Sequence, residues 1–315
     1  DLGSICYLYI GHIDRARTTL REAGDLWREL DNLPMLADSL ASQTVACVYA
    51  GDFDEAVALS DEAFEISESI GNLWGQSYSR WAIGWVFSER GEWCRAIEVM
   101  NASIQLGDLA GFGATQTYTR SDLATLYGDI GAVARGLEMA RSALAAGENR
   151  RHLVDRAKIL GVLAHLHLMD GDLDEAEAKL EEGRDDLYRT SWPLLVVAFD
   201  FAEIELLLAK READRALAAV DGLLDNLRRW GARAYLPYAL YLRGIALETE
   251  GETAAAWDSL KEARAAAAAV GSRRALWRIL PALARVEEDE EAAAAARRQA
   301  REIALFIADH LDDAG

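Results

Sequence analysis

The sequence predicts an all-α fold, a solenoid of about seven antiparallel helix pairs, and three observations support this prediction. A turn motif recurs every 40 residues, and a second set of helix breaks recurs midway between its copies. The segments between breaks are rich in Ala, Leu, Glu and Arg, with apolar residues three or four positions apart and no alternating strand pattern. Because a fixed internal period is the signature of repeat proteins, we expect one continuous body of stacked units.

The turn motif consists of a glycine, a few polar residues and a small residue. It joins two helices, which we name A (before the turn) and B (after it). The copies are GHIDRA at 11, GDFDEA at 51, GEWCRA at 91, GAVARG at 131, GDLDEA at 171, READRA at 211 and GETAAA at 251. Glycine lies mainly at the ends of the helical segments, where helices commonly stop.

The second set of breaks divides the chain into units. These breaks lie near 31, 71, 111, 151, 191, 231 and 271, and residues 1–315 are expected to form a single solenoid. The last unit lacks three residues and its turn is acidic, so 271–315 is predicted to be a degenerate capping repeat. The chain begins at Asp1 in the middle of a repeat, so we expect it to be a fragment of a longer protein.

All four prolines fall in A helices. Pro34 and Pro193 lie in the first turn, where a missing N–H costs nothing. Pro237 and Pro281 lie deeper, so they are expected to delay or kink the start of the helix.

The composition argues against several classes of partner. With 33 basic and 53 acidic residues the net charge is −20, which disfavours binding to nucleic acid or to an anionic membrane surface. The chain shows no signal peptide and no uncharged segment of membrane-spanning length. Cys6, Cys47 and Cys94 are too scattered for a disulfide framework, so we expect a cytoplasmic protein.

A pattern of small and large residues runs through the units. The middle of helix A is small in all but one unit (Ser4, Thr44, Gly84, Ala124, Ala164, Gly244 and Ala284, with Ile204 as the exception), and three positions later come Tyr7, Cys47, Phe87, Tyr127, His167, Leu207 and Leu247. Helix B is small at Ala16, Ala56, Ala96, Gly136, Ala176, Ala216 and Ala256. This pattern resembles the tetratricopeptide repeat family, although the usual repeat has 34 residues.

The resemblance implies a right-handed superhelix whose A helices line the concave side. Longer repeats of this kind are similar to those in regulatory regions of bacterial LuxR-type and maltose-activator-like transcription factors and related signal-transduction NTPases. By that resemblance we expect a regulatory module of a signalling protein, with effector domains covalently attached in the full-length protein.

No enzyme signature is present in the sequence. It contains no phosphate-binding glycine loop, nucleophile elbow or HExxH motif, so we expect neither catalysis nor a cofactor. His165 and His167 are two positions apart on a helix and point away from each other, which argues against a shared metal. His167 occupies the core aromatic position and is expected to be packed.

Equivalent positions of successive A helices should form a groove with aromatic, hydrogen-bonding and charged side chains. Exposed aromatic rings with polar tips suit binding surfaces because they offer a large contact area at little entropic cost. The candidate ligand- or partner-binding residues are Tyr78, Trp81, Trp85, Tyr118, Arg120, Ser121, Thr125, Lys158, His165, Phe201, Glu205, Tyr238 and Tyr241. We expect Trp81 and Trp85 to be exposed in the groove, whereas Trp74, at the helix start, fits a packed or an exposed position equally well.

Charged residues on the A helices allow two further hypotheses. Arg80 and Arg120 repeat across neighbouring units and suit either a surface ion pair or a clamp for a ligand carboxylate, the ion pair being favoured. Glu203 and Arg243 occupy the same position in consecutive repeats, which suggests a partly buried ion pair between them.

The function that the sequence favours is non-catalytic recognition of a protein or peptide segment, or of a small ligand, in the concave groove. Two alternatives remain open. One is a scaffold that assembles through its convex faces or ends, and the other is a small-sugar sensor, since stacked tryptophans also suit sugar faces.

Overall fold

The computed structural model describes residues 2–113, 115–148, 153–189 and 192–311, and within these ranges it is all-helical. The A helices are α1 (Leu2–Tyr9), α3 (Leu33–Ala50), α5 (Leu73–Glu89), α7 (Arg120–Asp129), α9 (Leu153–Asp170), α11 (Val197–Ala209), α13 (Leu236–Thr249) and α15 (Arg273–Val286). The B helices are α2 (Ile13–Glu29), α4 (Phe53–Ser69), α6 (Trp93–Ala110), α8 (Val133–Glu148), α10 (Leu173–Arg189), α12 (Ala213–Trp230), α14 (Thr253–Val270) and α16 (Glu290–Asp309). A π-helical turn (η1, Thr115–Thr119) and two 3₁₀ turns (η2, Pro193–Leu195; η3, Arg233–Tyr235) precede three of the A helices.

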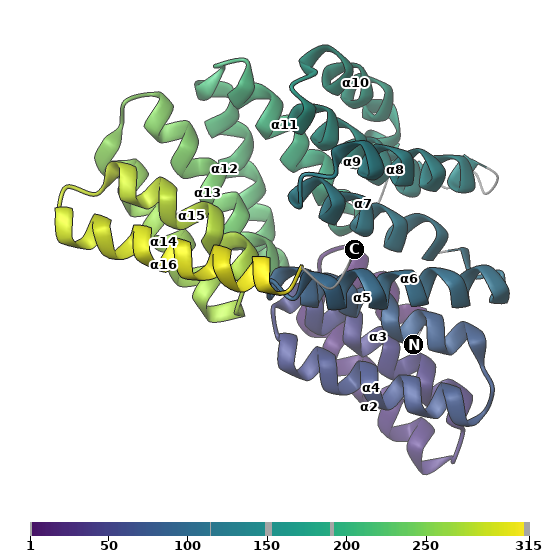
Figure 1. Ribbon diagram of the computed structural model, residues 1–315. Coiled ribbons are helices and arrows are strands. Elements are labelled where there is room, and N and C mark those ends of the chain that lie inside the picture. The colour runs from purple at the N-terminus through teal and green to yellow at the C-terminus, as the bar shows by residue number, and fades with distance from the viewer. Residues whose placement is uncertain (1, 114, 149–152, 190–191, 312–315) are drawn as a thin grey trace.

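The predicted fold class, an α-solenoid of paired helices, is confirmed. Each A helix packs against the B helix that follows it, and the described residues form eight pairs, of which the first has a short A helix. Figure 1 shows the pairs following one another around a curved path, from α2 and α4 to α14 and α16. The expected breaks near 151 and 191 lie outside the described residues.

The chain turns between consecutive helices at residues whose backbone is in the left-handed conformation. Gly51, between α3 and α4, has φ 80° and donates its N–H to the carbonyl of Val48. A glycine adopts this conformation without the penalty that a Cβ would bring, which explains why glycine recurs at these corners. Asp31 and Arg211 take the same conformation with φ of 52° and 60°.

Small residues allow the helices of a pair to approach closely. At Gly84 a Cβ would lie only 2.4 Å from Met100 of α6, and both Gly84 and Met100 are buried. The large residues beside the small ones, such as Phe87 and Tyr127, are almost fully buried. His167 is also buried, as its core position predicts.

Three of the four prolines lie at the starts of A segments. Pro34 occupies the first turn of α3, where Asn32 accepts the N–H of Met35. Pro193 is the first residue of η2. The α-helix α13 begins only at Leu236, so the delayed helix start expected at Pro237 is observed. Pro281 lies inside α15, which begins at Arg273 without delay.

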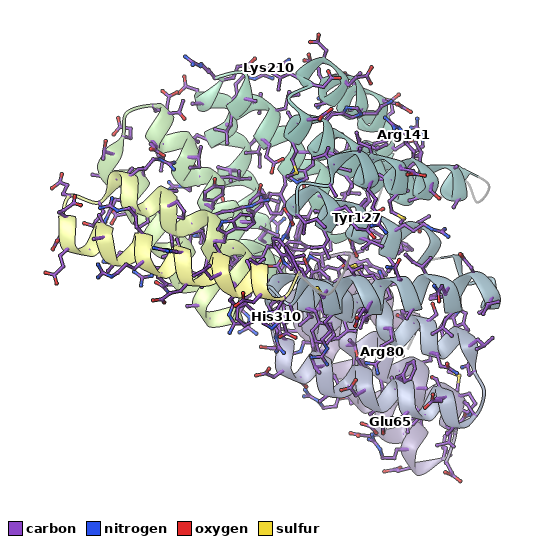
Figure 2. All side chains as sticks on the ribbon, in the orientation of Figure 1. Glu65, Arg80, Tyr127, Arg141, Lys210 and His310 are labelled. Atoms are coloured by element: carbon purple, nitrogen blue, oxygen red, sulfur yellow. The ribbon has the colours of Figure 1, made fainter. Side chains whose placement is uncertain are left out.

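The solenoid curls so tightly that its last units contact its first units. Arg233 donates to the carbonyl of Ala50, and Arg273 donates to the carbonyl of Arg90, each across 183 residues of sequence. At the end of α16, the carbonyl of His310 accepts the N–H of Cys94 at 3.1 Å, and Figure 2 shows His310 beside the N-terminal helices. The molecule therefore forms a closed turn around a central axis.

No helix within the described part of the chain combines the length and the apolar character that crossing a membrane requires.

Candidate functional site

A cavity lies on the axis of the closed turn. Its volume is about 120 Å³, and every residue that lines it belongs to an A helix or to the short turn that precedes one. The contributing elements are α3, α5, α7, α9, η2, α11, η3, α13 and α15. Because the A helices converge here, this is the concave side of the solenoid.

One side of the cavity is polar and centres on Glu205 of α11. His165 of α9 donates from Nδ1 to Glu205 at 2.5 Å, since an ionised carboxylate can only accept. The hydroxyl of Tyr238 in α13 also donates to Glu205, and Arg278 of α15 donates to that hydroxyl at 3.2 Å. These contacts join four successive A helices.

The network continues to α7 and α5, in the N-terminal half of the solenoid, through Asp129 at the end of α7. Asp129 is almost fully buried and accepts Arg274 at 2.6 Å and Arg278 at 2.5 Å. Arg274 also donates to Glu89 of α5 at 2.8 Å, and Glu89 accepts the Ser272 hydroxyl. These ion pairs close the turn of the solenoid across the cavity.

Two carboxylates of this network, Asp129 and Glu205, remain ionised although little of either side chain is exposed. Burial alone would raise the pKa of Asp129, but Arg274 and Arg278 hold it below its usual value. Burial would likewise raise the pKa of Glu205, but His165, Tyr238 and Arg278 lower it. The polar side of the cavity is thus built from groups whose charges are already compensated.

One polar atom in the cavity is uncompensated. His165 Nε2 is buried and has no hydrogen-bond partner among the described residues, while its Nδ1 is fixed by Glu205. Such an orphaned atom is rare in folded proteins because it carries the full cost of desolvation. A bound group could pair with it.

Another part of the cavity lining is aromatic. The ring of Tyr235 lies 5.6 Å from that of Trp85, 5.9 Å from Tyr49 and 6.1 Å from Phe201, and Phe201 contacts Tyr238 at 5.0 Å. These edge and tilted contacts leave an apolar wall beside the polar network.

The formal charges of the cavity lining balance. Three acids lie among the lining residues, Glu89, Asp122 and Glu205, and three permanent cations, Lys158, Arg274 and Arg278. Lys158 is paired with Asp122 at 2.8 Å. With charges balanced, shape and hydrogen bonding decide what the cavity can hold.

The structure brings seven of the thirteen predicted site residues together in this cavity. They come from five A helices, and all are partly buried. The seven are Trp85, Thr125, Lys158, His165, Phe201, Glu205 and Tyr238. Tyr241 lies just outside, stacked on Tyr238 at 5.8 Å.

The expected exposure of Trp81 in the groove is wrong, and three of the candidate residues around it are buried too. Trp81 is only 4% exposed, Tyr78 and Tyr118 are buried as well, and Ser121 is fully buried. Trp81 stacks between Tyr78 and Tyr118, and the Tyr78 hydroxyl lies 3.1 Å from that of Ser42. The tight curl brings neighbouring A helices into contact along this stripe, so the rings fill space between helices.

Trp74 is partly buried and packs against Phe112 and Tyr78. Of the two positions that fitted it, the structure supports the packed one. Trp85, by contrast, keeps part of its ring toward the cavity.

The charged residues form helix-to-helix ion pairs. Arg80 pairs with Asp61 and Arg120 with Asp108 at 2.9 Å, so the favoured hypothesis for these arginines holds. The proposed pair of Glu203 and Arg243 is wrong. Glu203 pairs with Arg184, and Arg243 pairs with Asp221. Each side chain reaches the B helix that precedes its own A helix, and not the neighbouring A helix.

Sequence reasoning missed Tyr49, Glu89, Asp129, Tyr235 and Arg274. Glu89 and Asp129 stand two positions before the corner residue in consecutive units, and arginine stands at 274 where the early units have Pro34 and Trp74. These departures from the repeat pattern were the available signal. Their pairing across the turn depends on the pitch of the superhelix.

No group of three or more His, Cys, Asp or Glu side chains that could hold a metal ion occurs within the described ranges.

Comparison with known proteins supports the fold. No family model matches the chain, and no curated protein matches it in sequence. Among solved structures it is similar to a Rap protein complexed with competence and sporulation factor, with a TM-score of 0.65 and 15% identity over 94% of this chain and 85% of that one. It is also similar to aspartyl phosphate phosphatase F from Bacillus subtilis, with a TM-score of 0.52 and 14% identity over 99% and 87% of the two chains. At such identity the likeness establishes a helical-repeat solenoid of tetratricopeptide type.

Proposed function

We propose that this chain is a non-catalytic recognition module that binds an extended peptide, or a peptide segment of a partner protein, with one side chain anchored in the axial cavity. The observation that carries the proposal is the cavity itself. It lies where the A helices converge, with an aromatic wall, a fixed polar network and the orphaned Nε2 of His165. Preformed sites of this kind, apolar with a few placed polar groups, are typical of ligand binding.

The size of the cavity favours a side chain over a sugar. Its volume of about 120 Å³ is comparable to the ~150 Å³ of an engineered cavity that holds benzene. A single aromatic or aliphatic side chain fits such a space, whereas a hexose ring with its hydroxyl groups is larger. Trp81, one of the two tryptophans expected to be exposed in the groove, is also packed between helices.

A solved structure of similar fold supports binding by such a solenoid. The Rap protein to which the chain is similar was determined in complex with competence and sporulation factor. We include in the proposal a regulatory role in the cytoplasm, with an attached effector domain that responds to occupancy. The repeat resemblance supports this wider role.

The test selects ligands without assuming their sequence. A display library of randomised short peptides is panned on the wild-type chain, and the enriched peptides are measured by isothermal titration calorimetry. We expect Trp85→Ala to weaken an enriched peptide by at least about tenfold, since aromatic anchors commonly contribute about 2 kcal/mol. His165→Phe, which keeps a ring but removes Nε2, should weaken it as well.

Trp27→Ala is the matched control, because Trp27 lies on α2 and not in the cavity lining. It should leave the affinity unchanged. Thermal unfolding of each variant checks that the fold is retained. If no peptide is enriched, or if the enriched peptides bind Trp85→Ala and wild type equally, the proposal is wrong.

A further inference from the structure

A ridge of exposed apolar side chains runs along the first three corners at which a B helix ends and the next A helix begins. It includes six of the nine large apolar residues that are exposed in the described part of the chain. We call it the corner ridge: Leu26, Leu30, Leu33, Ile70, Leu73 and Leu109. Leu109 is 76% exposed and Leu30 67%. In Figure 1 the loops after α2 and α4 project at the lower right, away from the C-terminal helices. Exposed large apolar side chains gathered at successive corners suit an interaction site.

The same kind of corner is covered later in the chain, so the molecule itself shows what binds there. Trp230, at the end of α12, packs on Gly11, where an added Cβ would lie 2.1 Å from its ring. Val270, at the end of α14, packs on Gly51 in the same way, at 2.7 Å. Trp230 and Val270 hold the repeat positions that Leu30 and Ile70 hold in the first units. In both contacts, the corner at which a B helix ends packs on a glycine corner at which an A helix ends.

The corners at which an A helix ends and the next B helix begins are left uncovered in the later units. In the part of the chain that the structure describes, an added Cβ at Gly131, Gly171 or Gly251 would meet no atom within 4 Å, in contrast to Gly11 and Gly51. Arg211, at the equivalent corner, is exposed and has the same left-handed backbone. We call these four the free corners. They repeat at the 40-residue spacing at which Leu30 and Ile70 repeat on the corner ridge.

We propose that the corner ridge of one copy of this chain docks on the free corners of a second copy, continuing between molecules the turn-on-turn contact seen within one. The contact is heterologous, because two different surfaces meet, so each copy keeps one surface available for a further copy. Self-association should therefore form head-to-tail chains and not stop at a dimer. This inference is independent of peptide binding in the axial cavity.

The charges around the two surfaces predict how this association depends on salt. In the internal contact, Arg233 meets Asp52 at 2.7 Å. Exposed acids stand at both intermolecular surfaces instead, with Asp31 and Glu68 near the ridge, although Arg211 adds one cation at the free corners. Exposed acids also stand beside the free corners, at Asp170, Asp172, Glu250 and Glu252. Because salt screens like-charge repulsion between exposed groups, association should strengthen as salt rises.

Sedimentation velocity over a range of protein concentrations tests the proposal. In about 0.5 M NaCl, where screening is strong, we expect the mean mass to rise steadily with concentration beyond that of a dimer. Leu109→Gln should reduce this association at least about threefold. Leu305→Gln, which removes an exposed leucine from α16, is the matched control and should not change it.

Two further measurements identify the surfaces. Glu250→Lys places a cation at a free corner and should strengthen association at low salt, whereas Glu98→Lys, an equal charge change on α6, should not. A Leu109→Gln chain keeps its free corners, so a small amount added to wild type should cap growing chains and lower their mean mass. A monomer at every concentration and salt would overturn the proposal. So would a dimer that does not grow, or association that Leu109→Gln and Glu250→Lys leave unchanged.

Discussion

Asp200, in the first turn of α11, shows how a single burial changes a titration. Burial, reinforced by the neighbouring charge of Glu203, raises the pKa of Asp200 from 3.8 to about 7. The folded protein therefore favours the protonated carboxyl more than the unfolded chain does. The stability from this preference is complete below the unfolded pKa and is lost as the pH rises through the folded one.

This leads to a prediction for Asp200→Asn, whose side chain cannot ionise. Thermal or urea unfolding near pH 8 should show the variant about 1–2 kcal/mol more stable than wild type, a value that allows for partial exposure of the carboxyl. The difference should shrink toward zero as the pH falls through 4 to the unfolded pKa of 3.8, since wild-type Asp200 is then protonated in the folded state and becomes protonated in the unfolded chain as well. Asp258→Asn, at an exposed site on α14, controls for the loss of one negative charge. A difference that does not depend on pH would contradict the assignment.

Also at the residue scale, His165 and His167 show how a site residue differs from a core residue. His165 and His167 stand on one helix, and each has a buried nitrogen that no hydrogen-bonding group of the described residues reaches. Only His165 faces the axial cavity, where Glu205 fixes its ring. The positions of the two residues in the repeat distinguish them, since 167 is a core position and 165 belongs to the concave stripe.

At the scale of the elements, the contact between α15 and the ends of α5 and α7 closes the solenoid. Asp129 alone accepts two arginines of α15, and its side chain is 1% exposed. Because Arg274 and Arg278 hold the pKa of Asp129 low, this stabilisation is present above the unfolded pKa and is lost as the pH falls. Ion pairs thus hold the last helix pair against α5 and α7.

Replacing Asp129 with asparagine should be costly, because both arginines would lose a buried counter-charge. We expect Asp129→Asn to lower the free energy of unfolding by about 3–5 kcal/mol in urea titrations. Asp221→Asn is the matched control, since Asp221 pairs with Arg243 at a more exposed site and should cost less than about 1 kcal/mol. Equal effects of the two substitutions would contradict the role given to Asp129.

The repeat pattern also explains what could be predicted at this scale. Local rules define the helices, because glycine corners and small residues such as Gly84 and Ala96 recur at fixed positions. The same period placed Trp85, His165 and Glu205 on the concave side, and they do line the cavity. The period could not reveal how closely neighbouring A helices approach, so it misplaced Trp81.

At the scale of the whole molecule, the pitch of the superhelix determines the site. Arg233 and Ala50, or Arg274 and Glu89, occupy different positions of the repeat and are more than four units apart. No local pattern pairs them, since their contact results from small rotations accumulated over several units. The sequence therefore predicted the lining of a groove, but not the contacts between distant units that close the groove into a cavity.

The central claim is that a bound peptide inserts a side chain into this cavity, and fluorine NMR tests it most directly. The chain is labelled with 5-fluorotryptophan, its nine resonances are assigned by substitution, and a peptide enriched on the wild type is titrated in. We predict that the Trp85 resonance shifts and saturates with the peptide while that of Trp27, on α2, stays in place. Saturable binding that leaves the Trp85 resonance unmoved would contradict the account.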